Sequence, residues 1–387
     1  MKFDVLVVGA GLAGAAFAAA LRSSSLKIGI VEARPPYRPT GWDPRIYAIS
    51  PSNVDFLTAI GIWPHLDTSR IAPVYDMEIH GDAGGQLELS AYDCGLRELA
   101  WIIESSLMQL ELWETVKRQH NVTLLCPAEP SALAMDEDAG RLTLADGRRL
   151  EARLIVAADG RDSWVRQAAA IGARNTPYGE KGVVANFRCE KPHRNTAFQW
   201  FRKDGILAYL PLPEQQMSMV WSAPDALADE LVGLPPAELC ARVAEAGGYR
   251  LGALELITPA AAFALRLMRV ETVVQPRLAL IGDAAHAIHP LSGHGINLGY
   301  QDARVLAEQL ATLPAWRDPG ELSLLRAYAR ARAEETALLQ YTTHGLNRLF
   351  KPADPLLSGL RNFGLNLTNR LPVVRNALMR YAIAGRF

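Results

Sequence analysis

The sequence of 387 residues lacks the features that define several large classes of protein. It contains no run of about 20 uninterrupted apolar residues, so we expect no membrane-spanning helix. Its 40 lysine and arginine residues balance 41 acidic ones, and a net charge of −1 gives no electrostatic basis for binding nucleic acid. Its four cysteines (Cys94, Cys126, Cys189 and Cys240) are widely spaced, which favours free thiols in a reducing compartment over disulfides or a metal site. We therefore expect a cytoplasmic globular protein that binds no metal.

The glycines, by contrast, stand at informative places. Residues 4–8 are apolar after Asp4, which is typical of a strand buried on both faces, and an alanine-rich helix is predicted over 13–21. Between them, Gly9-Ala10-Gly11-Leu12-Ala13-Gly14 has the spacing that permits a tight turn, an approach of backbone to a pyrophosphate, and close packing of helix on strand. A second strand over 27–31 ends at Glu32, whose carboxylate can accept from ribose hydroxyls. This pattern predicts a dinucleotide site and leaves FAD and NAD open.

Two later strand ends favour FAD. Asp159-Gly160 ends a second apolar strand and Gly282-Asp283 ends a third, which implies contacts beyond an adenosine half. Asp-Gly is also a common turn, and it recurs here at 146–147 and 204–205. The loop 290–299 then carries glycines at which backbone can lie against a flat ring, and a helix predicted from Gly295 points its positive end at that loop. His286 and His289 are three apart, but we interpret them as structural or cofactor-adjacent rather than as metal ligands.

The remaining pattern predicts an α/β fold: a Rossmann-like FAD-binding domain with an inserted, mostly antiparallel β-sheet substrate domain and a helical C-terminal region. A hairpin over 74–89, a long helix over 96–116, and strands over 183–188, 196–202 and 217–221 support this organisation. We predict a discontinuous FAD-binding domain (1–73, 96–180 and 268–330), a substrate domain (74–95 and 181–267) and a C-terminal helical region (331–387).

With its motifs in this order, the chain resembles a known family over essentially its whole length. The further motifs are Asp43-Pro44-Arg45, Ile102-Ile103-Glu104-Ser105, Gly282-Asp283-Ala284-Ala285-His286, Asn297-Leu298-Gly299 and the tail segment 381–385. They are similar to those of the group A flavoprotein aromatic hydroxylases with the para-hydroxybenzoate hydroxylase fold, and more narrowly of the ubiquinone-biosynthesis hydroxylases.

The resemblance implies a role for each matching residue. Contacts to FAD are implied for Gly9, Gly11, Leu12, Ala13, Gly14, Glu32, Ala33, Arg34, Arg45, Gln109, Asp159, Gly160, Gly282, Asp283, Pro290, Gly293, Gly295, Ile296 and Asn297. Pro290 and His294 are the implied catalytic residues at the flavin ring. The chain departs from the family at His294, where glutamine is common, and at Ser292, where alanine is common, so the side-chain effects on the ring differ here.

The implied activity is that of an NAD(P)H-using monooxygenase that hydroxylates a polyprenylated phenol or quinol through a flavin C4a-hydroperoxide. The protein then positions the reactants, excludes water and stabilises charge. This fits a sequence without a P-loop, a GxSxG elbow or an HExxH motif. Two rivals remain: a flavin-dependent prenyl or quinone reductase, and a non-catalytic FAD-binding subunit of a ubiquinone-biosynthesis complex. The ring position, the choice between NADH and NADPH, and the oligomeric state are not indicated.

Two segments have two interpretations each. Trp200, Tyr209, Met219 and Trp221 alternate at strand period, and they either line a pocket for the small hydrophobic aromatic substrate, with O2 as the second small-molecule partner, or pack in a core. The segment 355–387 carries five arginines (Arg361, Arg370, Arg375, Arg380 and Arg386) and no acid. It either contacts a membrane surface or a ubiquinone-biosynthesis complex, or forms helices on the main body with arginines in solvent.

Overall fold

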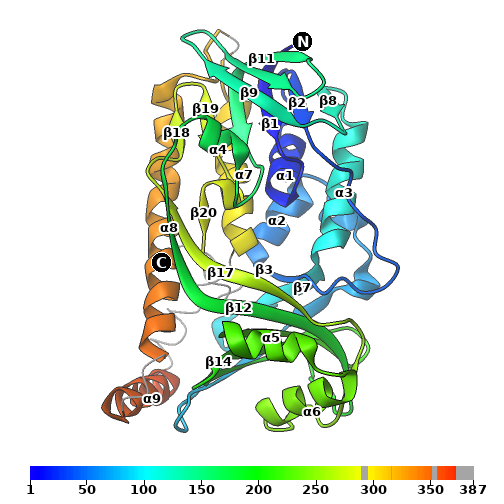
Figure 1. Ribbon diagram of the computed structural model, residues 1–387, viewed down its shortest axis with the longest axis vertical. Coiled ribbons are helices and arrows are strands. Elements are labelled where there is room, and N and C mark those ends of the chain that lie inside the picture. Colours follow the sequence, from blue (N-terminus) through cyan, green and yellow to red (C-terminus); the bar gives the residue numbers. More distant parts are fainter. Residues whose placement is uncertain (289–294, 315, 351–354, 372–387) are drawn as a thin grey trace.

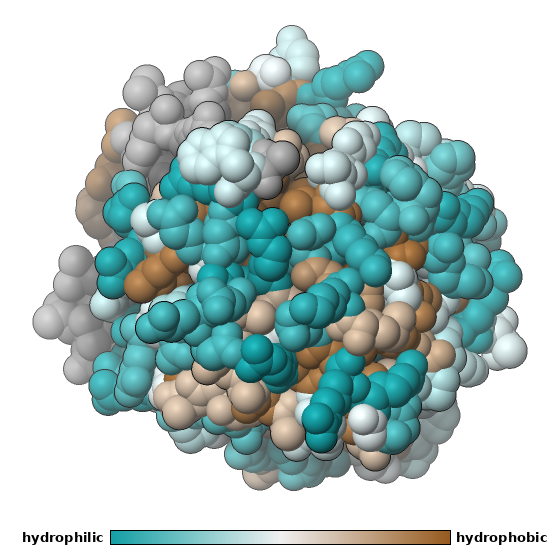
Figure 2. Space-filling model, turned by 90° about the horizontal axis from the view of Figure 1, so that it is seen from above, coloured by the Kyte–Doolittle hydropathy of each residue, from teal (hydrophilic) through white to brown (hydrophobic). Residues whose placement is uncertain are grey.

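The computed structural model describes residues 1–288, 295–314, 316–350 and 355–371. Two large sheets lie toward opposite ends of the long axis, and one long helix runs along a side past both of them (Figure 1). Seen from the end that carries the first sheet, hydrophilic and apolar residues are interspersed over the surface (Figure 2). The predicted α/β architecture, with a Rossmann-like unit and a mostly antiparallel layer, is confirmed.

The first sheet has the order β18-β19-β11-β1-β2-β8, and the hairpin β9–β10 joins it through β11. The neighbours from β19 to β8 are all parallel, which explains why their sequences read as continuous apolar runs. The strands are β1 (Lys2–Val8), β2 (Ile28–Val31), β8 (Val122–Leu125), β9 (Pro130–Met135), β10 (Gly140–Leu144), β11 (Arg149–Ala157), β18 (Val274–Gln275) and β19 (Leu278–Leu280).

Helices and the hairpin cover the two faces of this sheet. Val5 and Val7 of β1 pack in one apolar cluster with helices, whereas Leu6 and Val8 pack with the β9–β10 hairpin on the other face. The helices of this half are α1 (Leu12–Ala20), α2 (Pro51–Ala59), α3 (Ser105–Arg118), α4 (Trp164–Ala168) and α7 (Gly295–Ala311). The alanine-rich α1 is buried almost all round because α3 and α7 flank it.

The second sheet has the order β20-β17-β12-β15-β14-β13-β5-β6, with β16 paired to β12. It is antiparallel except where β13 runs parallel to β5. Its strands are β5 (Asp76–His80), β6 (Gln86–Ser90), β12 (Ala173–Cys189), β13 (Thr196–Arg202), β14 (Gly205–Leu212), β15 (Gln216–Pro224), β16 (Leu254–Leu256), β17 (Ala261–Val270) and β20 (His286–Ala287). Helices α5 (Asp225–Gly233) and α6 (Pro236–Ala246) cover its outer face (Figure 1).

One predicted element is wrong. The helix expected over 96–116 begins only at Ser105, because residues 100–104 form β7 (Ala100–Glu104). This strand lies between β3 (Ile46–Ile49) and β4 (Ala72–Val74) in a small third sheet, where pairing on both edges outweighs any local preference for helix. The division into domains by residue range stays a prediction, and β12 itself runs through the proposed boundary at 180–181.

Two helices complete the described chain. α8 (Leu322–Phe350) is the long helix at the side, and α9 (Pro355–Arg370) lies beyond its far end, beside β6 (Figure 1). Among the helices of the described ranges, none is long and apolar enough to cross a bilayer.

A buried charge network joins α7, α8 and β20. Asp302, 1% exposed, accepts from Arg332 Nε at 2.8 Å and contacts His286 Nε2 at 2.7 Å. Burial alone would raise the pKa of Asp302, but His286 and Arg332 outweigh it, and the pKa is lowered. Burial would likewise lower the pKa of His286, yet the Asp302 carboxylate raises it. The same carboxylate accepts from Gly282 N at 2.9 Å, so the network also holds the turn after β19.

Replacing Asp302 with asparagine should cost about 3 kcal/mol of unfolding free energy, because it leaves the buried Arg332 charge poorly compensated. The lowered pKa of Asp302 means that its contribution is lost as the pH falls below about 4, and the raised pKa of His286 means that its share is lost as the pH rises above about 6.5. Urea unfolding should therefore show the largest difference in unfolding free energy between wild type and Asp302→Asn at pH values between about 4 and about 6.5. Asp283→Asn, on the same turn but exposed, is the control, and an equal effect there would contradict the network.

Candidate active site

The three predicted glycine turns meet at one edge of the first sheet. Strands β1, β11 and β19 are parallel neighbours, so their carboxyl ends lie at the same edge. The turns at Gly9, Asp159-Gly160 and Gly282 follow these three ends directly. In open α/β sheets this edge is where ligands bind.

Contacts between the turns show how close this approach is. A Cβ added at Gly9, whose φ is +100°, would lie 2.4 Å from the carbonyl oxygen of Ala158, and one at Gly14 would lie 2.1 Å from that of Gly9. A Cβ at Gly282 would lie 3.0 Å from Cβ of Ala13. Close contact with backbone therefore requires glycine at Gly9 and Gly14, and the Ala13 methyl group of α1 leaves little room for a side chain at Gly282.

Gly11 differs from its neighbours, and it provides a test of whether a cofactor fits. A Cβ added at Gly11 would meet no atom within 4 Å, although the residue precedes α1 directly. No side chain caps this helix, and its first turn begins with Leu12 and Ala13. Free N–H groups beside open space at a helix N-terminus suit a pyrophosphate, so the residues present fit FAD.

Glu32 lies beside the same turn. Its Oε2 accepts from Ala10 N at 2.7 Å and its Oε1 from Arg34 N at 3.1 Å. Each carboxylate oxygen has a second lone pair, so the side chain is held in place and can still accept from a ribose. Ala33 is half-buried and Arg34 is exposed in the loop that follows.

The other two turns each supply a carboxylate. Asp159 Oδ2 accepts from Val165 N at 3.0 Å, but its Oδ1 is buried without a partner. Burial raises the pKa of Asp159, and a donor from a bound molecule would lower it again. Gly160 and Gly282 have φ of +82° and +59°, and Asp283 is exposed beside the second of these turns. An unpartnered buried oxygen and an exposed acid at this edge fit a hydroxyl-rich chain such as ribityl.

The start of α7 is placed by Asn297. Its Nδ2 donates to Ala48 O at 2.7 Å, and its Oδ1 accepts from Ser50 N at 2.9 Å, which ties α7 to the β3–α2 junction. Gly295 and Ile296, at the first turn of α7, are half-buried. Pro290, Ser292, Gly293 and His294 lie outside the described residues, so the predicted catalytic pair has no structural account.

The loop that carries Arg45 is held by a buried acid, Glu104, which was quoted above within a family motif but was given no role. Glu104, 1% exposed, accepts from Arg70 at 2.6 and 2.7 Å and from Asp43 N at 2.6 Å. Ser105 N donates to Arg45 O at 2.9 Å. The signals in the sequence were its place in that motif and its position at the end of an apolar run. Gln109, one turn further along α3, is half-buried.

Two aromatic residues near Arg45 were also missed. The Arg45 guanidinium lies over the ring of Phe263, 5.0 Å from its centroid, so β17 reaches this loop. Burial raises the pKa of Tyr47, and both Arg45 and Asp283 act on its hydroxyl electrostatically. The Arg45 segment therefore lies close to the turn after β19.

The predicted pocket residues lie mainly in a core. Tyr209, Met219 and Trp221 are at most 2% exposed and pack with α5 and α6 on the outer face of the second sheet. Trp200 is half-buried at the margin of this cluster, with its ring centroid 4.8 Å from that of Tyr209. Packing accounts for this placement, and the pocket role predicted for the four residues gains no support from it.

The inner face of the same sheet carries polar residues that the sequence analysis overlooked. Asn186 of β12 and Ser218 of β15 are paired across the sheet and fully buried. Asn186 Nδ2 donates to Asp43 O at 3.1 Å, whereas Asn186 Oδ1 and Ser218 Oγ have no partner. Buried oxygen atoms without partners are rare in native proteins, and here they point to a bound molecule or water beside the Arg45 loop.

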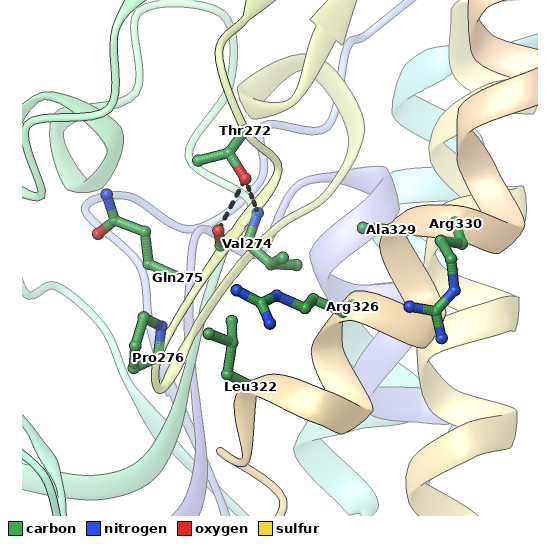
Figure 3. A pocket seen from close by; sticks show the side chains of 8 residues that line it. All are labelled: Thr272, Val274, Gln275, Pro276, Leu322, Arg326, Ala329 and Arg330. Atoms are coloured by element: carbon green, nitrogen blue, oxygen red, sulfur yellow. Dashed lines mark hydrogen bonds between the residues drawn. The ribbon is translucent and has the colours of Figure 1, made fainter.

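A cavity of about 400 Å³ lies away from these turns. Strand β18 and α8 line it, and Arg326 extends toward Val274 and Pro276 (Figure 3). It borders the amino end of β19, whereas Gly282 follows the carboxyl end. We therefore place it outside the site.

The contrast between Gly11 and Gly14 gives a matched test. Gly14→Ala should lower the unfolding free energy by about 1–3 kcal/mol, because the new methyl group meets backbone. Gly11→Ala should leave stability without cofactor within about 0.5 kcal/mol. It should still weaken FAD binding about tenfold or more, since the methyl group occupies the open space. Urea unfolding and fluorescence titration with FAD measure the two effects, and equal FAD affinity of Gly11→Ala and the wild type would contradict the placement.

Glu104→Gln should destabilise the protein by about 2 kcal/mol, because hydrogen bonds to a buried charged group are lost. It should also raise the proteolytic sensitivity of the chain near Asp43, since the anchor of that loop is weakened. Glu114→Gln on the exposed side of α3 is the control and should be neutral within about 0.5 kcal/mol. Identical cleavage patterns for all three proteins would show that Glu104 does not hold the loop.

Comparisons with known proteins agree with this geometry. A family model described as an FAD binding domain matches residues 2–340. Ubiquinone hydroxylase UbiL of Rhodospirillum rubrum is 33% identical over 384 residues, which cover 98% of this chain and 89% of that protein. The 3-demethoxyubiquinol 3-hydroxylase of Escherichia coli is 31% identical, with 98% of each chain covered.

Solved structures share the architecture. The p-nitrophenol 4-monooxygenase PnpA of Pseudomonas putida aligns with a TM-score of 0.80 at 18% identity, covering 98% of this chain and 97% of that one. Such a likeness shows the fold, while the family match extends over most of the sequence. The chain thus belongs to the FAD binding domain family, and its fold is that of the flavoprotein monooxygenases.

Proposed function

We propose that the protein is an FAD-dependent, NAD(P)H-using monooxygenase that hydroxylates the aromatic ring of a polyprenylated phenol or quinol in ubiquinone biosynthesis. One observation carries the proposal. Turns that fit FAD lie near the polar inner face of a second sheet, in a chain whose relatives over 98% of its length are ubiquinone hydroxylases. A flavin site beside a buried, hydrogen-bonding surface suits oxidation of a ring that carries oxygen substituents.

The cofactor contacts follow from the geometry. The α1 N-terminus at Gly11 would hold the pyrophosphate, Glu32 the ribose, and Asp159 and Asp283 the hydroxyl-rich chain. When bound, FAD would accept reducing equivalents from NAD(P)H and activate O2. The remaining residues predicted for FAD, from Arg45 and Gln109 to Pro290 and Gly293, stay in the proposal on sequence grounds.

The substrate contacts are assigned to the inner face of the second sheet. Asn186 and Ser218 would accept from, or donate to, the oxygen substituents of the ring and so orient it. Position and exclusion of water are then the protein's contribution, since the cofactor carries the reactivity. Pro290 and His294 remain the proposed residues at the flavin ring, with His294 as the departure that would modify it.

Location and partners belong to the proposal as well. The substrate and O2 are the small-molecule partners, and a polyprenyl tail partitions into lipid. We therefore place the protein in the cytoplasm with peripheral contact to a membrane or to a ubiquinone-biosynthesis complex.

The proposal is tested with purified protein, FAD, NAD(P)H and a short-chain prenylphenol. We expect a yellow protein whose NAD(P)H oxidation is stimulated by substrate with equimolar O2 uptake, and a product heavier by one oxygen atom. Asn186→Ala should raise KM or uncouple oxidation from product formation about tenfold, with unchanged FAD content. Reductant consumption without O2 uptake would favour the reductase, and FAD binding without stimulation would favour the non-catalytic subunit.

A further inference from the structure

Helix α9 attaches to the body of the protein through its polar side. Asn362, Asn366 and Asn369 lie on one side of the helix, and their Oδ1 atoms accept from the backbone N–H groups of Gly85 (2.8 Å), Gln86 (2.9 Å) and Glu88 (3.1 Å). Strand β6 is the last strand of its sheet. These asparagines therefore satisfy an edge that would otherwise be open.

A buried ion pair strengthens the attachment. The Arg361 side chain, 2% exposed, donates from Nε to Asp82 Oδ1 at 3.1 Å, and Asn362 Nδ2 donates to the same atom at 2.8 Å. Hydrogen bonds from Arg361 are the main cause that lowers the pKa of Asp82 to about 2. The inner side of α9 is thus polar, charged and fixed.

The outer side of α9 is apolar, the reverse of an ordinary surface helix. Phe363, Leu367 and the adjoining Leu371 follow one another at intervals of four residues and are 64%, 44% and 44% exposed. Arg370 is exposed on the same side and has no acidic partner among the described residues. The helix therefore presents a row of apolar groups next to a guanidinium.

The charge of this region indicates what covers the row. No aspartate or glutamate occurs from residue 355 to the end of the sequence, and of the two arginines of this segment that lie in the described residues, Arg361 is paired with Asp82 and Arg370 has no acidic partner. A second copy of the protein would bring two acid-free, arginine-bearing segments together. Anionic lipid headgroups would neutralise them while their acyl chains take up the apolar row.

We propose that the outer face of α9, formed by Phe363, Leu367, Arg370 and Leu371, docks on an anionic lipid surface. The inference makes the peripheral membrane contact proposed above more specific. Its biological reason rests on the proposed function, because a polyprenylated substrate must be drawn from lipid. The docking itself is a physical property of the helix and is measured without turnover.

The test uses the full-length FAD-loaded protein in flotation with phosphatidylcholine vesicles, with and without about one third phosphatidylglycerol. Wild type should float mainly with the anionic vesicles. Phe363→Asn/Leu367→Asn should reduce the bound fraction about tenfold, and Arg370→Gln should reduce binding only to anionic vesicles, about fivefold.

The control is Val232→Asn/Trp316→Asn, which removes two exposed apolar side chains elsewhere (42% and 84% exposed) and should float like wild type. Equal FAD content and thermal midpoints would show that the α9 variants are folded, since none of the substituted residues belongs to the asparagine ladder (Asn362, Asn366 and Asn369) that binds the edge of the sheet. Equal flotation of wild type and the α9 double variant would overturn the proposal. So would equal binding of wild type to both kinds of vesicle, or a dimer that the double variant abolishes without any vesicle binding.

Hydroxylation of a water-soluble, short-chain substrate separates the two proposals. The α9 double variant should turn it over like wild type. Loss of vesicle binding with full turnover supports the docking face, whereas vesicle binding without hydroxylation by the wild type would contradict only the proposed function.

Discussion

The site depends on backbone segments approaching more closely than side chains would permit. At Gly9, Gly14 and Gly282 an added methyl group would meet another turn or helix at 3.0 Å or less. Parallel pairing brings the ends of β1, β11 and β19 together at one edge, and the glycine contacts fix α1 against them. Between the packed Gly9 and Gly14, a Cβ at Gly11 would meet no atom within 4 Å. The packing constraint and the open space for a cofactor thus belong to different glycines of the same motif.

Two buried ion pairs also hold the segments around these turns in place. Asp302 joins the turn at Gly282 to His286 and Arg332, and Glu104 joins Arg70 to the loop at Asp43. Both acids are 1% exposed, and both accept from backbone of a segment that borders the site. Pairing offsets the cost of burying each charge, and loss of one partner leaves the other charge buried without compensation. The two ion pairs position the loops that the cofactor and the ring would touch.

Much of the dinucleotide half could be predicted from the sequence, because each of its signals is local. A tight turn needs glycine within a few residues of a strand, and a buried parallel strand is apolar throughout. The strand at 100–104 could not be predicted in this way, since only pairing with β3 and β4 distinguishes it from helix. The face of the second sheet on which the four predicted pocket residues lie could not be predicted for a similar reason. Alternation showed that Met219 and Trp221 share a face, but only the position of α5 and α6 shows that it is the outer one.

The asparagine ladder of α9 bears on how the C-terminal region should be studied. Deleting the helix would remove its outer face and, at the same time, strip the acceptors from the N–H groups of β6. A truncated chain would then expose a bare strand edge, which is a template for intermolecular pairing. Aggregation or inactivity of such a chain would report that lost shielding rather than any missing contact with lipid.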